Sequence, residues 1–258
     1  MSYPDLKITF LGTGTSSGVP MIGCHCEVCT STDTKDKRLR SSILVQSALT
    51  TLVVDTTPDF RYQMLREKVD KLDAVIFTHP HKDHIAGLDD VKAYNFFLKK
   101  PMEVFANSLT ETALKREFYY IFADKKYPGT PKINLNSINN AFFLVGDILV
   151  EPILVHHLNM PVLGFKFNSF TYITDANRID DIEKEKIKHS DTIVLNALRE
   201  QSHISHYSLR EAVKLVDELQ IPNAFFTHVS HQMGKHADVN SGLPNNRKLA
   251  WDGLILRV

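Results

Sequence analysis

Cysteine is scarce in this sequence, and its placement argues against a disulfide-stabilised protein. The chain has three cysteines in 258 residues, and all of them fall between positions 24 and 29. An odd number of thiols so close together cannot form the spaced disulfide framework of small secreted proteins. A metal-binding role explains the three cysteines better.

Long apolar runs and excess charge are also missing. No run approaches the roughly 18 apolar residues of a membrane-spanning helix, and residues 1–7 lack an apolar core of signal-peptide length. We therefore expect a soluble, cytoplasmic protein that does not bind membranes. The 30 Lys and Arg residues balance 30 Asp and Glu residues, which argues against a broad basic surface for nucleic acid. A local pocket for a small polyanion is compatible with this balance.

The length of the chain and its hydrophobic pattern predict a large mixed α/β protein. One domain spanning residues 1–258 is the default expectation for this length. Apolar runs bounded by turn residues predict strands at 7–11, 42–45, 51–55, 72–78, 103–106, 141–145, 148–155, 163–167, 170–174, 191–196 and 223–227. Helices are predicted at 59–69, 89–98, 110–122 and 208–219. Strands followed by helices in each half favour a layered arrangement.

The stretch from Thr78 to His84 carries the strongest chemical signal. Directly after the apolar run 74–77, it places three imidazoles and a carboxylate within six residues, namely His79, His81, Asp83 and His84. In an extended segment His79 and His81 point the same way. Mixed nitrogen and oxygen donors suit zinc, manganese or iron. The sequence therefore predicts a metal site here rather than a pair of solvent-facing loop histidines.

A second metal site is predicted around the cysteines, which follow the pattern Cys-x-Cys-x2-Cys. Three thiolates cannot close a tetrahedral zinc site, so a fourth ligand must come from elsewhere. His231 is the candidate because it lies three residues after His228, and an odd separation in an extended chain turns the two rings to opposite sides. The predicted structural zinc ligands are Cys24, Cys26, Cys29 and His231.

Together these motifs resemble those of a known superfamily. The pattern His-x-His-x-Asp-His is typical of the metallo-β-lactamase fold, which implies a four-layer αββα sandwich with an active site along one edge of two paired sheets. The Gly-Thr-Gly loop at 12–14, the cysteine motif and Thr-His-x-Ser-His at 227–231 make the chain similar to the phosphoribosyl cyclic phosphodiesterase (PhnP-like) family. Residues 87–90 resemble a relative of that enzyme, which bears on the substrate more than on the chemistry.

The resemblance implies a centre with two divalent metals, zinc or manganese. The implied ligands are His79, His81 and His157 for one metal and Asp83, His84 and His228 for the other, with Asp175 as a bridge. His156 competes with His157, which we prefer because its distance to Gly164 is nearer that of the family. The strand-end Asp55 would orient a metal-bound histidine, although a turn-forming aspartate is the alternative.

The implied activity is hydrolysis of small phosphodiesters such as phosphoribosyl 1,2-cyclic phosphate through a metal-bridging hydroxide. A dinuclear centre lowers the pKa of the bridging water and stabilises the attacking and leaving oxygens. Asp83 and His206 are the predicted catalytic residues. His206 matches an extra histidine of the family and would protonate the leaving alkoxide, with His203 as the alternative. His25, His189 and His236 are expected to be surface residues.

Other functions stay open on the sequence alone. A tRNA 3′-end processing endonuclease shares the implied ligands, but the balanced charge and the cysteine motif argue against it. A non-catalytic, zinc-stabilised binding protein is disfavoured because the second-metal ligands are all present. Thioester activity would instead indicate glyoxalase-like hydrolysis. The aromatic and basic segment 118–132 serves either helix packing or as a substrate lid, and a homodimer is compatible with these features.

Overall fold

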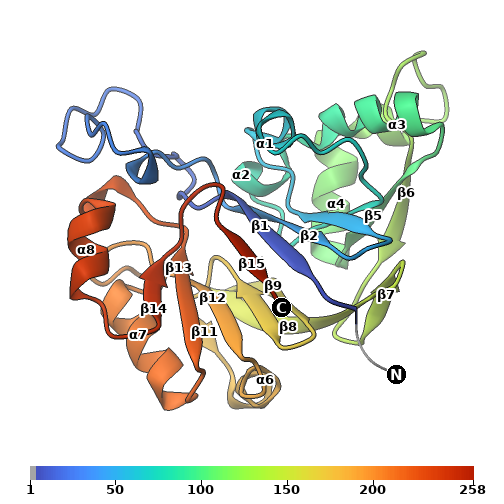
Figure 1. Ribbon diagram of the computed structural model, residues 1–258. Coiled ribbons are helices and arrows are strands. Elements are labelled where there is room, and N and C mark those ends of the chain that lie inside the picture. The colour runs from blue at the N-terminus through green and yellow to red at the C-terminus, as the bar shows by residue number, and fades with distance from the viewer. Residues whose placement is uncertain (1–3) are drawn as a thin grey trace.

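Two β-sheets pack face to face in the centre of the molecule (Figure 1). The computed structural model describes residues 4–258. The first sheet contains, in spatial order, β15 (Ile255–Arg257), β1 (Lys7–Gly12), β2 (Ser42–Gln46), β3 (Thr51–Val54), β4 (Ala74–Ile76), β5 (Met102–Ala106) and β6 (Ile133–Ser137). The second contains β11 (Arg178–Ile179), β8 (Ile148–His157), β9 (Met160–Phe167), β10 (Phe170–Ile173), β12 (Thr192–Asn196), β13 (Asn223–Thr227) and β14 (Arg247–Leu249), with β7 (Phe143–Val145) paired to β8.

Helices cover the outer face of each sheet. The first sheet is covered by α1 (Phe60–Arg66), α2 (Lys82–Ile85), α3 (Lys92–Leu98), α4 (Ser108–Glu117) and α5 (Tyr119–Phe122). The second is covered by α6 (Asp181–Ile187), α7 (Leu209–Glu218) and α8 (His236–Gly242). This helix–sheet–sheet–helix order confirms the predicted αββα sandwich.

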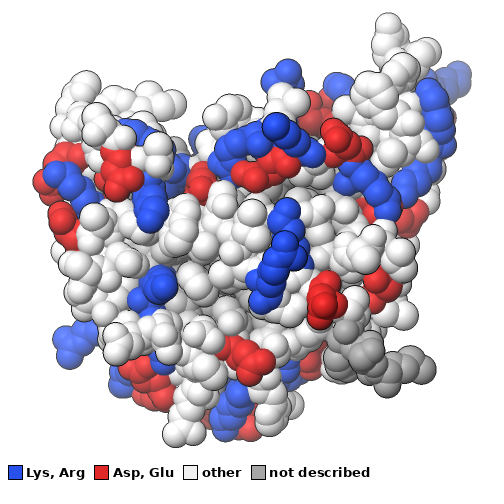
Figure 2. Space-filling model, in the orientation of Figure 1, with Lys and Arg blue, Asp and Glu red and all other residues white. Residues whose placement is uncertain are grey.

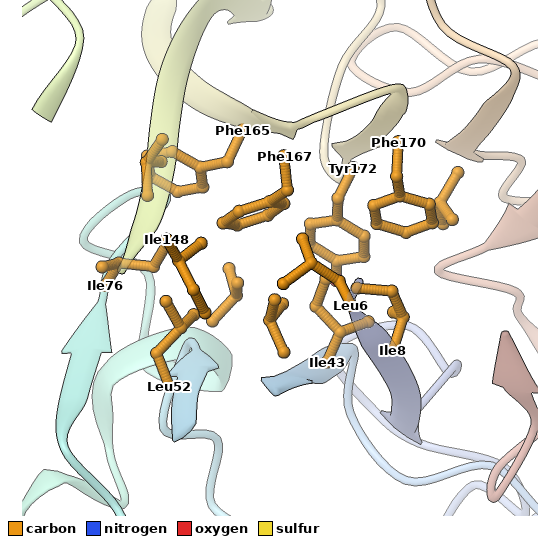
Figure 3. Close-up of a cluster of buried hydrophobic side chains, with 14 of the residues drawn as sticks. Leu6, Ile8, Ile43, Leu52, Ile76, Ile148, Phe165, Phe167, Phe170 and Tyr172 are labelled. Atoms are coloured by element: carbon orange, nitrogen blue, oxygen red, sulfur yellow. The ribbon is translucent and has the colours of Figure 1, made fainter. Parts of the chain in front are cut away.

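Apolar side chains fill the space between the sheets (Figure 3). Large residues of β9 and β10 lie opposite aliphatic residues of β1 and β2, and all are fully buried, as for Phe165, Phe167, Phe170, Tyr172, Ile8 and Ile43. Burying one such side chain contributes about 1.5–3 kcal/mol. The central layer therefore holds the two sheets, and the loops at their edges, in a fixed relative position.

The helix predicted at 110–122 is interrupted. Phe118 separates α4 from α5 because its backbone leaves the helical region, at φ −117° and ψ 40°. Its ring is buried in the core between the first sheet and its helices, while Tyr119 and Tyr127 are 72% and 84% exposed. Packing therefore explains part of the aromatic segment.

Several short elements lie outside the predicted ones, namely β6, β11, β14, β15, α2, α6 and α8. Strands β14 and β15 have three residues each and are stabilised by pairing with neighbouring strands. β14 pairs with β13, and β15 pairs with β1. Such strands carry too few apolar positions to be recognised by alternation.

Parallel strands of both sheets end at one edge of the sandwich. In the first sheet β3, β4 and β5 are parallel, and in the second β10, β12 and β13 are parallel. The backbone N–H of Leu163 in β9 donates to the carbonyl of Thr78 after β4 (3.0 Å), which joins the sheets at this edge. The loops that follow these strands carry most of the predicted site residues.

Two surface features bear on binding to membranes and nucleic acid. Among residues 4–258, no helix is long and apolar enough to cross a membrane. On the face seen in Figure 2, Lys and Arg side chains are intermingled with Asp and Glu side chains.

Candidate metal centre

Three site residues at strand ends have a left-handed backbone. Asp55, Asp175 and His228 have φ values of 65°, 53° and 57°. This conformation costs non-glycine residues on the order of 1–3 kcal/mol, and it persists where surrounding contacts determine it, often at functional sites. Because it reverses the chain directly after a strand, it keeps these side chains at the edge where the sheets meet.

Asp55 and Thr78 orient two of the histidines. Asp55 accepts hydrogen bonds from Thr78 N–H (2.8 Å), Thr78 Oγ1 (2.8 Å) and His84 Nδ1 (2.7 Å). Since the Thr78 hydroxyl gives its proton to Asp55, it accepts from His79 Nδ1 (2.9 Å). Both rings therefore carry a proton on Nδ1, and Nε2 is the nitrogen of each ring that can bind a metal. This role of Thr78 was not predicted, although the residue directly precedes the motif.

His79, His81 and His157 converge. His79 Nε2 lies 3.1 Å from His81 Nδ1, and the ring of His157 is centred 5.3 Å from that of His81. His157 Nδ1 donates to the carbonyl of Ser205 (2.8 Å), so Nε2 is the ring nitrogen that remains for a metal. Ring nitrogens this close to one another could bind one cation together through their lone pairs.

The structure distinguishes His157 from His156. The two are adjacent in β8, so they point to opposite faces. His156 Nε2 pairs with Asp180 Oδ2 at 2.9 Å, outside the metal centre. His157 is the residue that the fold brings to the other histidines.

The buried side chains of His84 and Asp175 lie beside the partly exposed Asp83. His84 Nε2 lies 3.3 Å from Asp83 Oδ2 and 3.3 Å from Asp175 Oδ2, yet this buried atom has no hydrogen-bond partner within residues 4–258. An unsatisfied buried polar group costs about 1–3 kcal/mol. A divalent cation bound by these three side chains would remove that cost.

The charges of this group also fit a cation. Burial alone would raise the pKa values of Asp83 and Asp175. Nevertheless His84 lowers the pKa of Asp83 below the ordinary range of aspartate, and His228 and His84 do the same for Asp175. Burial alone would lower the pKa of His84, but Asp175 and then Asp55 raise it well above its usual value. The carboxylates are therefore ionised, and the site stabilises positive charge, as a metal site must.

Asp175 belongs to two groups of metal-binding side chains. Ligand atoms of His79, His84 and Asp175 lie within 4.8 Å of one another, and so do those of His157, Asp175 and His206. His228 joins through Nδ1, which is 3.3 Å from Asp175 Oδ2. The shared carboxylate is the position that a bridging ligand would take.

His206 lies inside the centre rather than beside it. Its ring stacks on His228 at 4.8 Å and is 4.5 Å from His157, and its Nδ1 is 3.9 Å from Asp175 Oδ1. Burial, and then the neighbouring His228, lower the pKa of His206 to about 3. His203 is farther out, half-buried and centred 5.4 Å from His206.

The three cysteines meet His231. His231 Nδ1 lies 3.3 Å from Cys24 Sγ and 3.4 Å from Cys26 Sγ, and with Cys29 these ligand atoms lie within 4.8 Å of one another. The hydrogen bond with His231 lowers the pKa of Cys26 to about 6, and burial raises the pKa of Cys29 to about 11. The four side chains match a tetrahedral zinc donor set.

The segment from His228 to His231 is not extended, contrary to the expectation from sequence. β13 ends at Thr227, His228 is left-handed, and His231 begins a 3₁₀ helix that ends at Met233. The ring reaches the cysteines because the backbone turns at His228.

His236 is not a surface residue. It is 4% exposed, its Nδ1 lies 3.1 Å from Arg38 Nη2, and its N–H donates to Asp36 Oδ1 (2.7 Å). These contacts fasten α8 to the N-terminal segment that carries the cysteines (Figure 1). Partners about two hundred positions away could not be inferred from local sequence.

Known proteins share this fold over almost all of the chain. A family model described as Beta-lactamase superfamily domain matches residues 50–229. An octanoyltransferase of Porphyromonas gingivalis is 35% identical over 252 residues, covering 96% of this chain and 51% of that protein, so the chain spans about half the length of this relative. The crystal structure of a new diphosphatase from the PhnP family matches with a TM-score of 0.92 and 37% identity, covering 98% of this chain and 97% of that one. The short form of human tRNase Z, at 16% identity and a TM-score of 0.69 over 97% of this chain and 98% of its own, shows the fold alone.

Proposed function

We propose, from the premise that the chain belongs to the β-lactamase superfamily and is a PhnP-like, metal-dependent hydrolase, that it hydrolyses small phosphodiesters. Cyclic ribose phosphates are the proposed substrate class. The observation that carries the proposal is Asp175, which two groups of metal-binding side chains share, with His206 beside it. Such a centre suits the transfer of a phosphoryl group between two oxygens.

Two divalent ions, zinc or manganese, fit this donor set. The side chains of His79, His81 and His157 would hold one ion and those of Asp83, His84 and His228 the other, and Asp175 would be a further ligand. When bound, two such ions supply a water of lowered pKa and neutralise charge that develops on the phosphoryl oxygens.

The protein's own residues orient the metal ligands and supply a proton to the leaving group. Asp55 and Thr78 keep the Nε2 atoms of His79 and His84 directed into the centre. His206 holds the proton for the leaving oxygen, because a phosphodiester anion beside its ring favours the charged form and opposes the effect of burial.

A second candidate is hydrolysis of a diphosphate linkage, which is favoured by the 37% identical diphosphatase of the PhnP family. The leaving group of a diphosphate is a phosphate, which needs less help from a proton donor than a sugar alkoxide does. The two substrate classes therefore place different demands on His206.

A substrate panel tests the proposal. We expect the zinc- or manganese-loaded protein to hydrolyse a ribose cyclic phosphate and bis(p-nitrophenyl) phosphate, and chelation to abolish both activities without unfolding. A diphosphate diester, precursor tRNA and a thioester complete the panel. Preference for the diphosphate would favour the second candidate, and strong salt-dependent binding of tRNA or activity on the thioester alone would contradict both.

We also propose a structural zinc at Cys24, Cys26, Cys29 and His231, and predict that Cys26→Ser loses this zinc and melts at a lower temperature. A ligand present at about a thousandfold its Kd stabilises by about 4 kcal/mol, and each kcal/mol shifts Tm by about 2–4 °C in a chain of this size. A fall of roughly 10 °C is expected by calorimetry.

The matched control is His25→Ala in the same motif, since His25 is exposed and lies outside the ligand group. Zinc content measured by mass spectrometry should fall by one ion per chain only in the cysteine variant. Wild-type zinc content and Tm in Cys26→Ser would rule out the proposed site.

A further inference from the structure

We infer that Asn177 is a positioning residue for the reaction, because its carboxamide ties the loop that carries His206 to the turn that follows His157. Asn177 Nδ2 donates to the carbonyl of Ile204 (2.9 Å), and its Oδ1 accepts from the N–H of Leu158 (2.8 Å). The inference rests on the proposed function of this site.

Asn177 follows the bridging position closely along the chain. It comes two residues after Asp175, and its own N–H donates to the carbonyl of His156 (2.9 Å). The residue between them, Ala176, is held on both sides by Asn196, whose Oδ1 accepts from Ala176 N–H (2.8 Å) and whose Nδ2 donates to Ala176 C=O (2.9 Å). The segment that begins at Asp175 is therefore a fixed support for whatever Asn177 contacts.

The loop with His206 is attached to this support at two points. On the C-terminal side, the N–H of Tyr207 donates to the carbonyl of Ala176 (2.9 Å). On the N-terminal side, the Asn177 side chain holds Ile204. Ile204 is 74% exposed, so its own packing contributes little to the position of the loop, and the hydrogen bond to Asn177 takes that role.

Both catalytic-centre histidines depend on this attachment. The carbonyl of Ser205, between the attached Ile204 and His206, accepts from His157 Nδ1 (2.8 Å). A shift of the loop at Ile204 therefore turns the His157 ring and moves His206 away from Asp175. Misplacement of a reacting group by about 1 Å can cost 10²-fold in rate.

Asn177→Asp isolates the contact with Ile204. The aspartate keeps an acceptor for the N–H of Leu158 but places a carboxylate oxygen against the carbonyl of Ile204, where two acceptors repel. The matched control is Asn168→Asp, because Asn168 Nδ2 also donates to a backbone carbonyl, that of Pro4 (2.9 Å), at the opposite end of β10. If the charged variant does not fold, Asn177→Ala takes its place and loses both contacts.

The kinetic test compares two leaving groups in wild type, Asn177→Asp, His206→Ala and the double variant. We expect Asn177→Asp to lose about 10–100-fold on the ribose cyclic phosphate and much less on bis(p-nitrophenyl) phosphate, with metal content unchanged. Added to His206→Ala, it should cause only the small further loss that arises through His157, far below the product of the two single losses, because most of its effect acts through the His206 imidazole. Equal losses on the two substrates, or additive losses, would overturn the inference.

Amide hydrogen exchange tests the inference without turnover. In metal-loaded protein, exchange in residues 203–207 should be about tenfold faster in Asn177→Asp than in wild type, and unchanged in Asn168→Asp. Unchanged exchange in Asn177→Asp would refute the positioning role even if the wild-type enzyme were active. If the wild type hydrolysed neither diester, the proposed function would fail, while exchange alone would decide the role of Asn177.

Discussion

Asp83→Ala should lose at least about 10³-fold of the hydrolytic activity and remain folded. A metal at such a site stabilises the transition state by several kcal/mol, and each ~1.36 kcal/mol is a factor of ten in rate. Asp83 lies at the start of α2 and is partly exposed, so its removal leaves no core cavity. What it removes is a carboxylate 3.3 Å from His84 Nε2. Activity on bis(p-nitrophenyl) phosphate and bound metal measured on the same sample check this prediction.

Asp180→Ala is the matched control for Asp83→Ala. Asp180 is also an aspartate paired with a histidine, but its partner is His156, outside the centre. The control should keep wild-type activity and metal content. Full metal occupancy and a wild-type rate in Asp83→Ala would show that the proposed two-metal mechanism is wrong.

His206→Ala should separate substrates by their leaving groups. A sugar alkoxide needs a proton in the transition state, and a positioned acid contributes about 10²–10⁴-fold, whereas p-nitrophenolate leaves without one. We therefore expect a loss of that size on a ribose cyclic phosphate and a much smaller loss on bis(p-nitrophenyl) phosphate. Steady-state rates on the two substrates measure the difference.

Metal analysis decides between the two roles that the geometry allows His206. Its ligand atom lies within 4.8 Å of those of His157 and Asp175, so the ring is placed to bind a metal as well as a leaving group. Unchanged metal content in His206→Ala supports the acid role, and loss of an ion would make it a ligand. A selective loss in His203→Ala instead would transfer the acid role to that residue.

The sequence by itself determined the fold class and the densest part of the centre. His79, His81, Asp83 and His84 come from six consecutive residues after a buried strand. Over so few residues the end of the strand and the start of a helix leave the side chains little choice of position. The three cysteines likewise come from six consecutive residues. Apolar alternation predicted most strands because each buries one face, or both, in a sandwich of sheets.

Only the tertiary structure decided how distant side chains reach these groups and what orients them there. His157 contacts Ser205, 48 positions away, and Cys26 meets His231 across 205 positions. The family resemblance already favoured His157 over His156, and the cysteine pattern already led to His231. The structure adds the physical reasons, which are the face of β8 that borders the centre and the left-handed backbone at His228. No local sequence pattern predicts the contacts of Thr78 and Asn177 either. Such contacts depend on the packing of one sheet against the other, which a central core shared by both halves of the chain determines.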